Sequence, residues 1–315
     1  MSRLVAIEPQ PELLQSVLRR YFLATRPAFL SVTVVAVLLG WATAWRTQRF
    51  IEPLSAALTL LFALAAHAGA NVLNDYYDHV NGTDAANSER LFPFTGGSRI
   101  IQNGVLSPSA MARFGAALMI IVVPPGLWLA AHSGTGLIWI GASGLLIGWA
   151  YSAPPLKLAS RGFGEFAIAA GWWLIVVGSD FVQSGEWDIS AVTAGLGYGL
   201  MVANLLYINQ FPDGNADSRA GKMTIVARLG RRRSRAIYVA LACSAFVVLP
   251  VATHAGILPP STLLVAAAML PAGSAAYQLW EFGERPQHLL PAIKQTILAV
   301  HLYGLLLVFG LLFWR

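Results

Sequence analysis

The chain has 315 residues, of which 56% are hydrophobic and only 11% are charged, and its formal net charge is +6. A soluble domain carries about 25% charged residues. The composition therefore excludes an ordinary water-soluble globular protein and indicates a polytopic, all-α membrane protein. The single cysteine, Cys243, excludes a disulfide within the chain.

Apolar segments follow one another along the chain, each close to the ~20 residues that a helix needs to cross a bilayer. They lie at residues 28–45, 53–73, 107–130, 135–151, 164–183, 190–209, 236–254, 258–280 and 292–313. We therefore expect one domain over residues 1–315, built as a bundle of nine transmembrane helices. Residues 1–25 are polar or mixed and contain no cleavable signal pattern, so they are expected to form an N-terminal segment in the cytoplasm.

The basic residues predict the orientation of this bundle. If the N-terminus is cytoplasmic, then all of the 21 Lys and Arg residues except Arg46, Arg49 and Arg315 fall on the cytoplasmic side. The C-terminus then lies outside. Because the positive charge is explained by topology, we expect no binding of nucleic acid.

Two short polar clusters interrupt the apolar pattern. Residues 74–78 read Asn-Asp-Tyr-Tyr-Asp and are followed by Asp84, while residues 209–213 read Asn-Gln-Phe-Pro-Asp and are followed by Asp217. In each cluster an Asn precedes an Asp by four residues, so the two share a helix face. A carboxylate near hydrocarbon costs about 3 kcal/mol, which indicates a functional role. The predicted topology places both clusters on the cytoplasmic side.

The sequence around the clusters predicts their local shape. His67, Asn71, Asn74 and Asp78 follow at helical steps and form one polar stripe. Gly82 is well placed to end that helix. In the second cluster, Pro212 removes a backbone donor and is expected to bend the helix beside the site.

These side chains are suited to magnesium and phosphate. Mg²⁺ prefers oxygen ligands and is usually held by one or two carboxylates together with substrate phosphates. Two facing clusters therefore predict two Mg²⁺ ions bridging one diphosphate. The candidate metal ligands are Asn74, Asp75, Asp78, Asp84, Asn209, Asp213 and Asp217. The cations expected to bind the diphosphate are Arg90, Lys157, Arg161, Arg219 and Lys222.

At these residues the chain resembles the UbiA superfamily of intramembrane prenyltransferases over nearly its whole length. The two clusters look like that family's two Asp-rich motifs. The likeness is greatest to the 1,4-dihydroxy-2-naphthoate branch of menaquinone biosynthesis, because further matching segments occur at residues 82–84, 151–157, 161–165, 221–224 and 228–230. Arg99 and the Asn-Gln-Phe-Pro-Asp form of the second motif depart from the usual pattern and mark a subgroup.

The resemblance implies a fold and an activity. It implies a central cavity with the active site at the cytoplasmic face, in a bacterial inner membrane. There Mg²⁺ would assist transfer of a polyprenyl group from its diphosphate to an aromatic acceptor: 1,4-dihydroxy-2-naphthoate or, alternatively, 4-hydroxybenzoate, homogentisate or a similar compound. In the naphthoate branch, loss of the carboxylate accompanies ring alkylation.

The resemblance also separates roles among the residues. The catalytic set would be Asn74, Asp78, Asp84, Asn209, Asp213 and Asp217, with Asp75 less fixed. Candidate acceptor-binding residues are Arg26, His67, Asn71 and Tyr151. Rings that could shield an allylic cation are Phe22, Tyr76, Tyr77, Tyr151 and Tyr207.

Other classes of protein fit less well. A transporter also carries polar residues in its spans, but these would be spread over several helices at mid-membrane. A CDP-alcohol phosphotransferase requires an Asp-Gly…Ala-Arg pattern, and Asp213 and Gly214 are not followed by Ala-Arg at that spacing. Soluble prenyl-chain synthases are excluded by the nine apolar segments.

Overall fold

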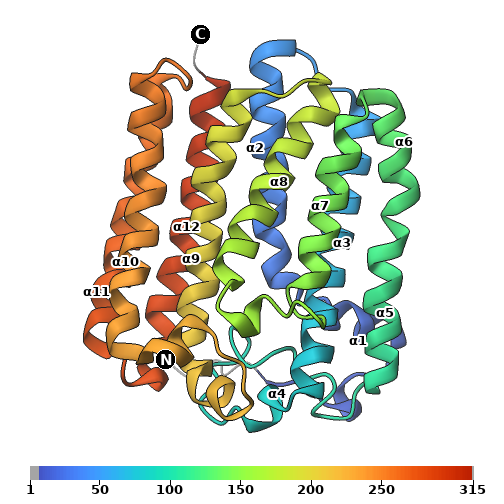
Figure 1. The fold of residues 1–315 in the computed structure, drawn as a ribbon, viewed down its shortest axis with the longest axis vertical. Coiled ribbons are helices and arrows are strands. Elements are labelled where there is room, and N and C mark those ends of the chain that lie inside the picture. Colours follow the sequence, from blue (N-terminus) through green and yellow to red (C-terminus); the bar gives the residue numbers. More distant parts are fainter. Residues whose placement is uncertain (1–6, 314–315) are drawn as a thin grey trace.

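The helices are arranged as one bundle whose members run roughly along the long axis of the molecule (Figure 1). The computed structural model describes residues 7–313, and within that range every regular element is a helix. The α-helices are α1 (Val17–Ala24), α2 (Pro27–Gln48), α3 (Pro53–Val80), α4 (Thr83–Ala86), α5 (Pro108–Ile121), α6 (Val123–Ser133), α7 (Gly136–Ala150), α8 (Gly164–Ser184), α9 (Ile189–Arg219), α10 (Ile225–His254), α11 (Met269–Phe282) and α12 (Leu290–Leu312). Short 3₁₀-helices are η1 (Pro11–Leu13), η2 (Ala159–Arg161), η3 (Pro260–Ala268) and η4 (Pro286–His288).

The nine predicted spans correspond to nine helical segments of the described chain. Eight of these are long and apolar enough to cross a membrane, and α7 is a shorter apolar helix. Two of the eight are composite, because α5 continues into α6 and η3 continues into α11. The predicted all-α, multi-pass membrane architecture is therefore confirmed.

Local sequence signals account for the starts of several spans. Proline occupies the first turn of α2, α3 and α5, where a backbone N–H is not needed. The Glu52 carboxylate caps α3 by accepting from the amides of Leu54 and Ser55 at 3.0 and 2.6 Å. Each signal satisfies or removes backbone donors that would otherwise be unpaired at the end of a helix.

The helix α9 is central to one half of the bundle, since it packs against α2, α8, α10 and α12. Gly199 brings α9 so close to α8 that a Cβ there would collide with the carbonyl of Ala169. Buried tyrosine hydroxyls also join neighbouring helices by donating to backbone carbonyls, in the pairs Tyr198–Val32, Tyr207–Ser234 and Tyr303–Ala245. Close backbone approach and interhelical hydrogen bonds are the usual means of holding membrane helices together.

Three helices extend further at one end than the apolar pattern predicts. α3 runs to Val80 rather than residue 73, α9 to Arg219 rather than 209, and α10 begins at Ile225 rather than 236. The added turns are polar, so hydropathy misses them although their backbone remains helical. Gly82, with a φ of 83°, follows the end of α3 as predicted.

The second polar helix is not interrupted at Pro212, because α9 continues as one helix through Pro212 to Arg219. The bend expected there stays a prediction. A non-helical residue occurs in the next helix, where Gly230 has φ 75° and ψ 156° inside α10. A proline removes one backbone bond, whereas a glycine in a left-handed conformation redirects the chain.

Both polar clusters lie at the same end of the bundle, together with α1 and α4 (Figure 1). The last turn of α12 lies at the opposite end, next to the short connection between α2 and α3. The longer connections, residues 81–107 and 151–163, belong to the first end. Arg3 and Arg315, which entered the charge count, lie outside the described residues.

Candidate active site

The first polar cluster forms a network on the last turns of α3. Asn74 donates from Nδ2 to Asp78 Oδ2 at 3.0 Å, which is the predicted contact across one helical turn, and also to Ser152 Oγ at 3.0 Å. Asn81 donates to the other oxygen of Asp78 at 3.3 Å. The carboxylate of Asp78 is thereby fixed toward the interior of the bundle, where it is buried.

Lys222 joins the two polar clusters. Its Nζ lies 2.8 Å from Asp78 Oδ2 and 3.8 Å from Asp217 Oδ1, although 144 residues separate Lys222 from Asp78. Burial alone would lower the pKa of Lys222, but the carboxylates of Asp78 and Asp217 raise that pKa well above its usual value. The amine is therefore held as a cation between α3 and α9.

Asp84 lies on the short helix α4 and is buried beside the 96–99 loop. Gln102 donates to its Oδ2 at 3.2 Å, and Arg99 donates to its backbone carbonyl at 2.5 Å. Burial raises the pKa of Asp84 well above its ordinary value, and the nearby carboxylates of Asp78 and Asp75 raise it further. The site thus concentrates negative charge in a small volume.

The second cluster lies on the last three turns of α9. Asp213 Oδ1 accepts from Asn87 Nδ2 at 2.6 Å, and Asp217 Oδ2 accepts from the hydroxyl of Thr224 at 3.2 Å. The remaining Oδ1 of Asp217 is buried and has no hydrogen-bond partner among the described residues, and the same holds for Asn209 Oδ1. Each of these side chains therefore retains an oxygen that a bound ligand can use.

These groups surround a cavity of about 80 Å³, which we call the polar cavity. Four carboxylates line it, from Asp78, Asp84, Asp213 and Asp217, against two cationic side chains, Arg26 and Lys222. The surplus of buried negative charge is what a bound cation would relieve.

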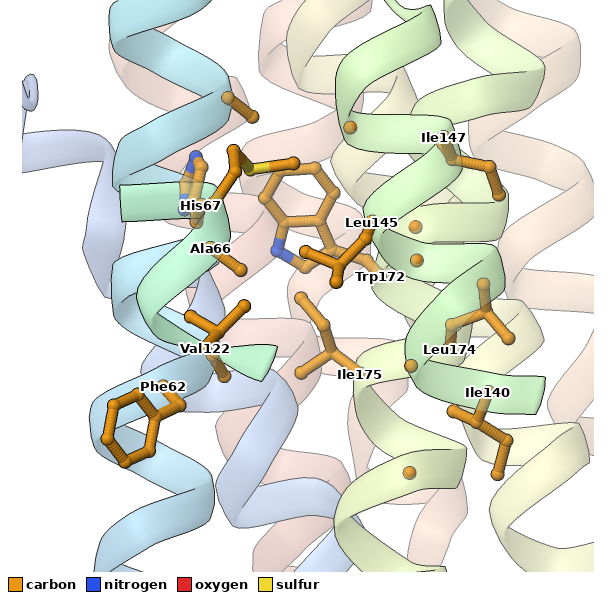
Figure 2. Close-up of a pocket in the computed structure, with 18 of the residues that line it drawn as sticks. Phe62, Ala66, His67, Val122, Ile140, Leu145, Ile147, Trp172, Leu174 and Ile175 are labelled. Atoms are coloured by element: carbon orange, nitrogen blue, oxygen red, sulfur yellow. The ribbon is translucent and has the colours of Figure 1, made fainter. Parts of the chain in front are cut away.

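A second and much larger cavity has a volume of about 650 Å³ and lies between helices α2 and α3 and helices α5 to α9. We call it the apolar cavity. Figure 2 shows its walls, with Phe62 and Val122 on one side and Ile140, Ile147 and Leu174 on the other. The two cavities meet at residues that line both, namely Arg26, Asn74, Tyr151, Leu206 and Asn209. A charged head group and a long apolar tail could therefore be accommodated side by side.

Of the predicted diphosphate-binding cations, the structure brings only Lys222 to the polar cavity. Arg90 lies nearby, but its Nε is 2.7 Å from Glu8 Oε1. Lys157, Arg161 and Arg219 are exposed outside the cavity. Sequence proximity to a motif did not separate cations that point inward from those that face water.

The predicted metal ligands are brought together with one exception. Asn74, Asp78, Asp84, Asn209, Asp213 and Asp217 all line the polar cavity. Asp75 turns away from it: Oδ2 accepts from the amide of Ser98 at 3.1 Å, and Oδ1 lies 3.7 Å from Arg26. Asp75 therefore supports the 96–99 loop and Arg26.

The predicted acceptor-binding residues Arg26, His67, Asn71 and Tyr151 all line the apolar cavity. Of the five rings expected to shield a cation, Tyr151 borders both cavities, and the other four border neither. Phe22 is 56% exposed on α1, and Tyr207 is fully buried with its hydroxyl bonded to Ser234. Helical position alone did not reveal which face of each helix turns inward.

Several site residues were missed by sequence reasoning. Asn87, Gln102 and Thr224 hold the carboxylates, and Ser152 accepts from Asn74. Trp172 lines the apolar cavity. Another is Gly97, where a Cβ would lie 2.5 Å from Asp84 Oδ2. The available signal was that Ser152 and Thr224 lie in the family-like segments 151–157 and 221–224.

The donor set is compatible with Mg²⁺. It consists of carboxylate and amide oxygens, which are the ligands of a hard cation. No group of three His, Cys, Asp or Glu side chains within residues 7–313 could hold a metal ion by itself. The unpartnered oxygens of Asn209 and Asp217 therefore fit a site completed by substrate phosphates and water.

A spanning helical bundle with an acidic cavity at one end and an apolar cavity behind it defines an intramembrane protein that handles an amphiphilic substrate. The chain belongs to the UbiA prenyltransferase family, whose family model matches residues 32–289. It is thus a membrane-embedded transferase, and the resemblance drawn from the two polar motifs is confirmed.

Individual relatives and solved structures agree with this assignment. The chain is 27% identical over 294 residues to the 1,4-dihydroxy-2-naphthoate octaprenyltransferase of Escherichia coli, covering 91% of this chain and 92% of that protein. It is 26% identical over 290 residues to the Bacillus subtilis enzyme of the same name, covering 91% and 90%.

The fold is also similar to that of a UbiA homolog from Archaeoglobus fulgidus bound to GPP and Mg²⁺. That comparison has a TM-score of 0.57 and 13% identity, and it covers 91% of this chain and 99% of the other. A digeranylgeranylglyceryl phosphate synthase matches with a TM-score of 0.64 and 17% identity, covering 94% and 98%. These solved structures support the fold.

Proposed function

We propose that this protein transfers a polyprenyl group from its diphosphate to 1,4-dihydroxy-2-naphthoate, with Mg²⁺ as cofactor. The observation that carries the proposal is the junction of the two cavities at Asn74, Tyr151 and Asn209. A diphosphate fits the chemistry of the polar cavity, and a polyprenyl chain fits that of the apolar one. The names of the bacterial relatives support the choice of acceptor.

The metal ligands follow from the oxygens that face the polar cavity. Asp78, Asp84, Asp213 and Asp217, with the amide oxygens of Asn74 and Asn209, would hold two Mg²⁺ ions together with the diphosphate. When bound, Mg²⁺ supplies positive charge that stabilises the diphosphate as it leaves. The solved archaeal homolog with GPP and Mg²⁺ supports this choice of cofactor.

Lys222 acts on the same leaving group. Asp78 and Asp217 hold its ammonium at the junction of α3 and α9, where it can contact a diphosphate oxygen as a point charge. As the C–O bond of the prenyl diphosphate breaks, its electron pair stays on the diphosphate. The allylic carbon then carries positive charge, and Tyr151 is the ring that borders both cavities at this point.

The acceptor completes the reaction. The ring carbon that bears the carboxylate donates an electron pair to the allylic carbon and forms the new C–C bond. The C–CO₂⁻ bond at that carbon then breaks, so CO₂ leaves and its bonding electrons restore the aromatic ring. Arg26 lies at the junction, and its Nε is buried without a hydrogen-bond partner among the described residues. Its guanidinium is thus suited to bind the acceptor's carboxylate. The apolar walls exclude water that would capture the cation.

The orientation of the enzyme follows from its basic residues. Most of the Lys and Arg residues of the described chain lie in connections, or in the helix turns that adjoin them, at the end of the bundle that contains the polar cavity. We propose that this end faces the cytoplasm of a bacterial cell, with the N-terminus inside and the C-terminus outside. Water-soluble acceptor and diphosphate product would then exchange with the cytoplasm.

The experiment uses the full chain purified in detergent, with labelled geranylgeranyl diphosphate and a panel of aromatic acceptors, with Mg²⁺ or with EDTA. We expect prenylation of 1,4-dihydroxy-2-naphthoate that EDTA abolishes. Lys222→Ala should lower kcat/KM about 10²- to 10³-fold, because it removes one stabilising group at the leaving diphosphate.

Lys157→Ala is the matched control, since Lys157 is exposed and lies outside the polar cavity. It should leave the rate within about twofold of the wild-type value. Transfer to 4-hydroxybenzoate or homogentisate instead would correct the acceptor. Equal rates in the two lysine variants would contradict the site.

A further inference from the structure

One pair of rings with N–H groups lies in the apolar cavity, whose other polar lining residues include Arg26, Asn71, Asn74 and Asn209. His67 on α3 and Trp172 on α8 both line it and pack edge to face, with ring centroids 4.8 Å apart and ring planes at 86° (Figure 2). Both side chains are more than nine-tenths buried. The lining residues that surround them in Figure 2 are aliphatic or aromatic. The pair is therefore a local polar feature at a depth where hydrocarbon is expected.

The hydrogen bond to His67 defines which ring nitrogen is available. Thr33 Oγ1 lies 2.8 Å from Nδ1 of His67, so Nδ1 is engaged and Nε2 is left over. The hydroxyl of Thr33 has no backbone acceptor in its own helix, unlike that of Thr43, which donates to Gly40. We assign the tautomer in which the Thr33 hydroxyl donates to Nδ1 and Nε2 carries the proton, because that hydroxyl has no other acceptor among the described residues.

Trp172 contributes a second donor. Its Nε1 is buried and has no acceptor among the described residues. The adjacent Trp173 differs, because its Nε1 donates to the carbonyl of Val192 at 3.0 Å and it does not line the cavity. The sequence of α8 therefore provides one tryptophan with a satisfied N–H and one without.

Two N–H donors without acceptors are costly in an apolar environment unless a ligand supplies an oxygen. A polyprenyl chain is a hydrocarbon and cannot do so. The diphosphate is expected about 10 Å away along α3, since seven residues separate His67 from Asn74. The remaining substrate is the aromatic acceptor, whose ring carries oxygens.

We propose that His67 and Trp172 together bind a ring oxygen of the aromatic acceptor and so position its ring for attack. This inference rests on the proposed function and adds the subsite that selects an oxygenated ring. Two donors to one oxygen also favour its ionised form, which makes the ring more electron-rich. Thr33 is a positioning residue, because it acts through the tautomer of His67.

The test compares Trp172→Phe with Trp173→Phe in the full-length enzyme, using steady-state kinetics for both substrates. Trp172→Phe removes the unpaired N–H and the five-membered ring that carries it, and Trp173→Phe makes the same change in size. We expect Trp172→Phe to raise KM for the acceptor about three- to tenfold, as for one lost hydrogen bond, with KM for the prenyl diphosphate unchanged. Trp173→Phe should change neither KM.

A second measurement pairs the variants with an acceptor whose ring hydroxyl is replaced by hydrogen. In the wild-type enzyme this analogue should bind more weakly than the natural acceptor. In Trp172→Phe the difference in binding between the two acceptors should largely disappear. Such non-additivity shows that the Trp172 N–H and the acceptor hydroxyl interact directly. His67→Leu should behave in the same way as Trp172→Phe.

Three results would overturn the inference. The first is an acceptor KM unaffected by Trp172→Phe in an enzyme whose wild type is active. The second is an equal rise in both KM values, because Trp172 would then shape the channel for the prenyl chain. The third is a Trp172→Phe enzyme that prefers the natural acceptor over the analogue without the hydroxyl as strongly as the wild type does. A wild-type enzyme that prenylates no aromatic acceptor would instead overturn the proposed function, and this inference with it.

Discussion

At the scale of single residues, Asp213 and Asp217 are each held through one carboxylate oxygen, whereas both oxygens of Asp78 accept hydrogen bonds. Asp213 is bonded by Asn87, and Asp217 by Thr224. This arrangement fixes the direction of each carboxylate before the substrate arrives. Such preorganisation matters because a misplaced charge stabilises a leaving group poorly.

Gly97 is the residue whose replacement tests this arrangement most directly. In Gly97→Ala the new Cβ would lie 2.5 Å from Asp84 Oδ2 and 3.1 Å from Asp75 Oδ1, so Asp84 must move. We expect kcat/KM for the prenyl diphosphate to fall at least about tenfold, because a misplacement of 1 Å costs about 10²-fold in extreme cases. The measurement is the initial rate at limiting prenyl diphosphate.

The control is Gly104→Ala in the same loop. Its φ of 71° matches the 72° of Gly97, but nothing lies within 4 Å of the added Cβ. Both variants therefore carry the same backbone strain, and only one displaces a carboxylate. Equal losses of activity in the two would assign the effect to backbone strain and remove Asp84 from the explanation.

At the scale of the helices, the polar extensions of α3 and α9 bring the two motifs to one cavity. The connection at residues 220–224 then turns Lys222 back between them, assisted by a bond from the Lys222 amide to the Asp217 carbonyl at 2.8 Å. Tyrosine hydroxyls hold α9 against its neighbours, so its motif faces the interior.

Tyr207 tests the difference between a structural and a catalytic ring. Tyr207→Phe removes the bond to the Ser234 carbonyl. We expect it to lower stability by about 1 kcal/mol while leaving kcat unchanged, because Tyr207 borders neither cavity. Thermal unfolding in detergent and the transfer rate measure the two effects.

Tyr277→Phe is the control for loss of a hydroxyl, since Tyr277 is 71% exposed on α11. It should alter neither stability nor rate. A lower kcat for Tyr207→Phe with an unchanged unfolding temperature would contradict the structural role and favour shielding of the allylic cation.

At the scale of the whole molecule, the size of the apolar cavity sets which donors fit. The cavity of about 650 Å³ extends from the junction with the polar cavity to Leu137 and Val182 near the opposite end of the bundle. Its wall at α7 is lined by small residues such as Gly141 and Gly144. These leave room for several isoprene units beyond the reacting carbon.

Gly144→Phe should therefore shorten the accepted chain. Nothing lies within 4 Å of a Cβ built at Gly144, so a larger side chain can enter the cavity without displacing the backbone. We expect kcat/KM to fall more for geranylgeranyl diphosphate than for dimethylallyl diphosphate. The ratio of the two values is the measurement.

Gly273→Phe provides the comparison, because Gly273 is exposed on α11 and also has open space around it. It should leave the ratio unchanged. An equal loss for both donors in Gly144→Phe would indicate general damage to the bundle and contradict a role in chain length.

Much of the fold was predictable from the sequence. Nine apolar segments predicted nine spanning segments, because burial in hydrocarbon leaves a strong signal in every span. Asn74 and Asp78 were predicted to share a helix face, and they are hydrogen-bonded at 3.0 Å. Such features depend on local periodicity, which the sequence carries by itself.

The partners of the site were less predictable. Asn87 meets Asp213 across 126 residues, and Lys222 meets Asp78 across 144. Lys157 and Arg161 carry the same charge near a matching motif, yet they are exposed. Charge and motif position could not separate them, because the direction of a side chain depends on how its helix or loop packs.

The sequence alone determined the class of this protein: its spans, its two acidic motifs and its resemblance to the UbiA family. Tertiary structure decided which cation joins the motifs, where the polar cavity meets the apolar one, and that His67 lies against Trp172. The reason is physical. Helical periodicity is a property of neighbouring residues, whereas a cavity exists only where distant helices pack and leave space.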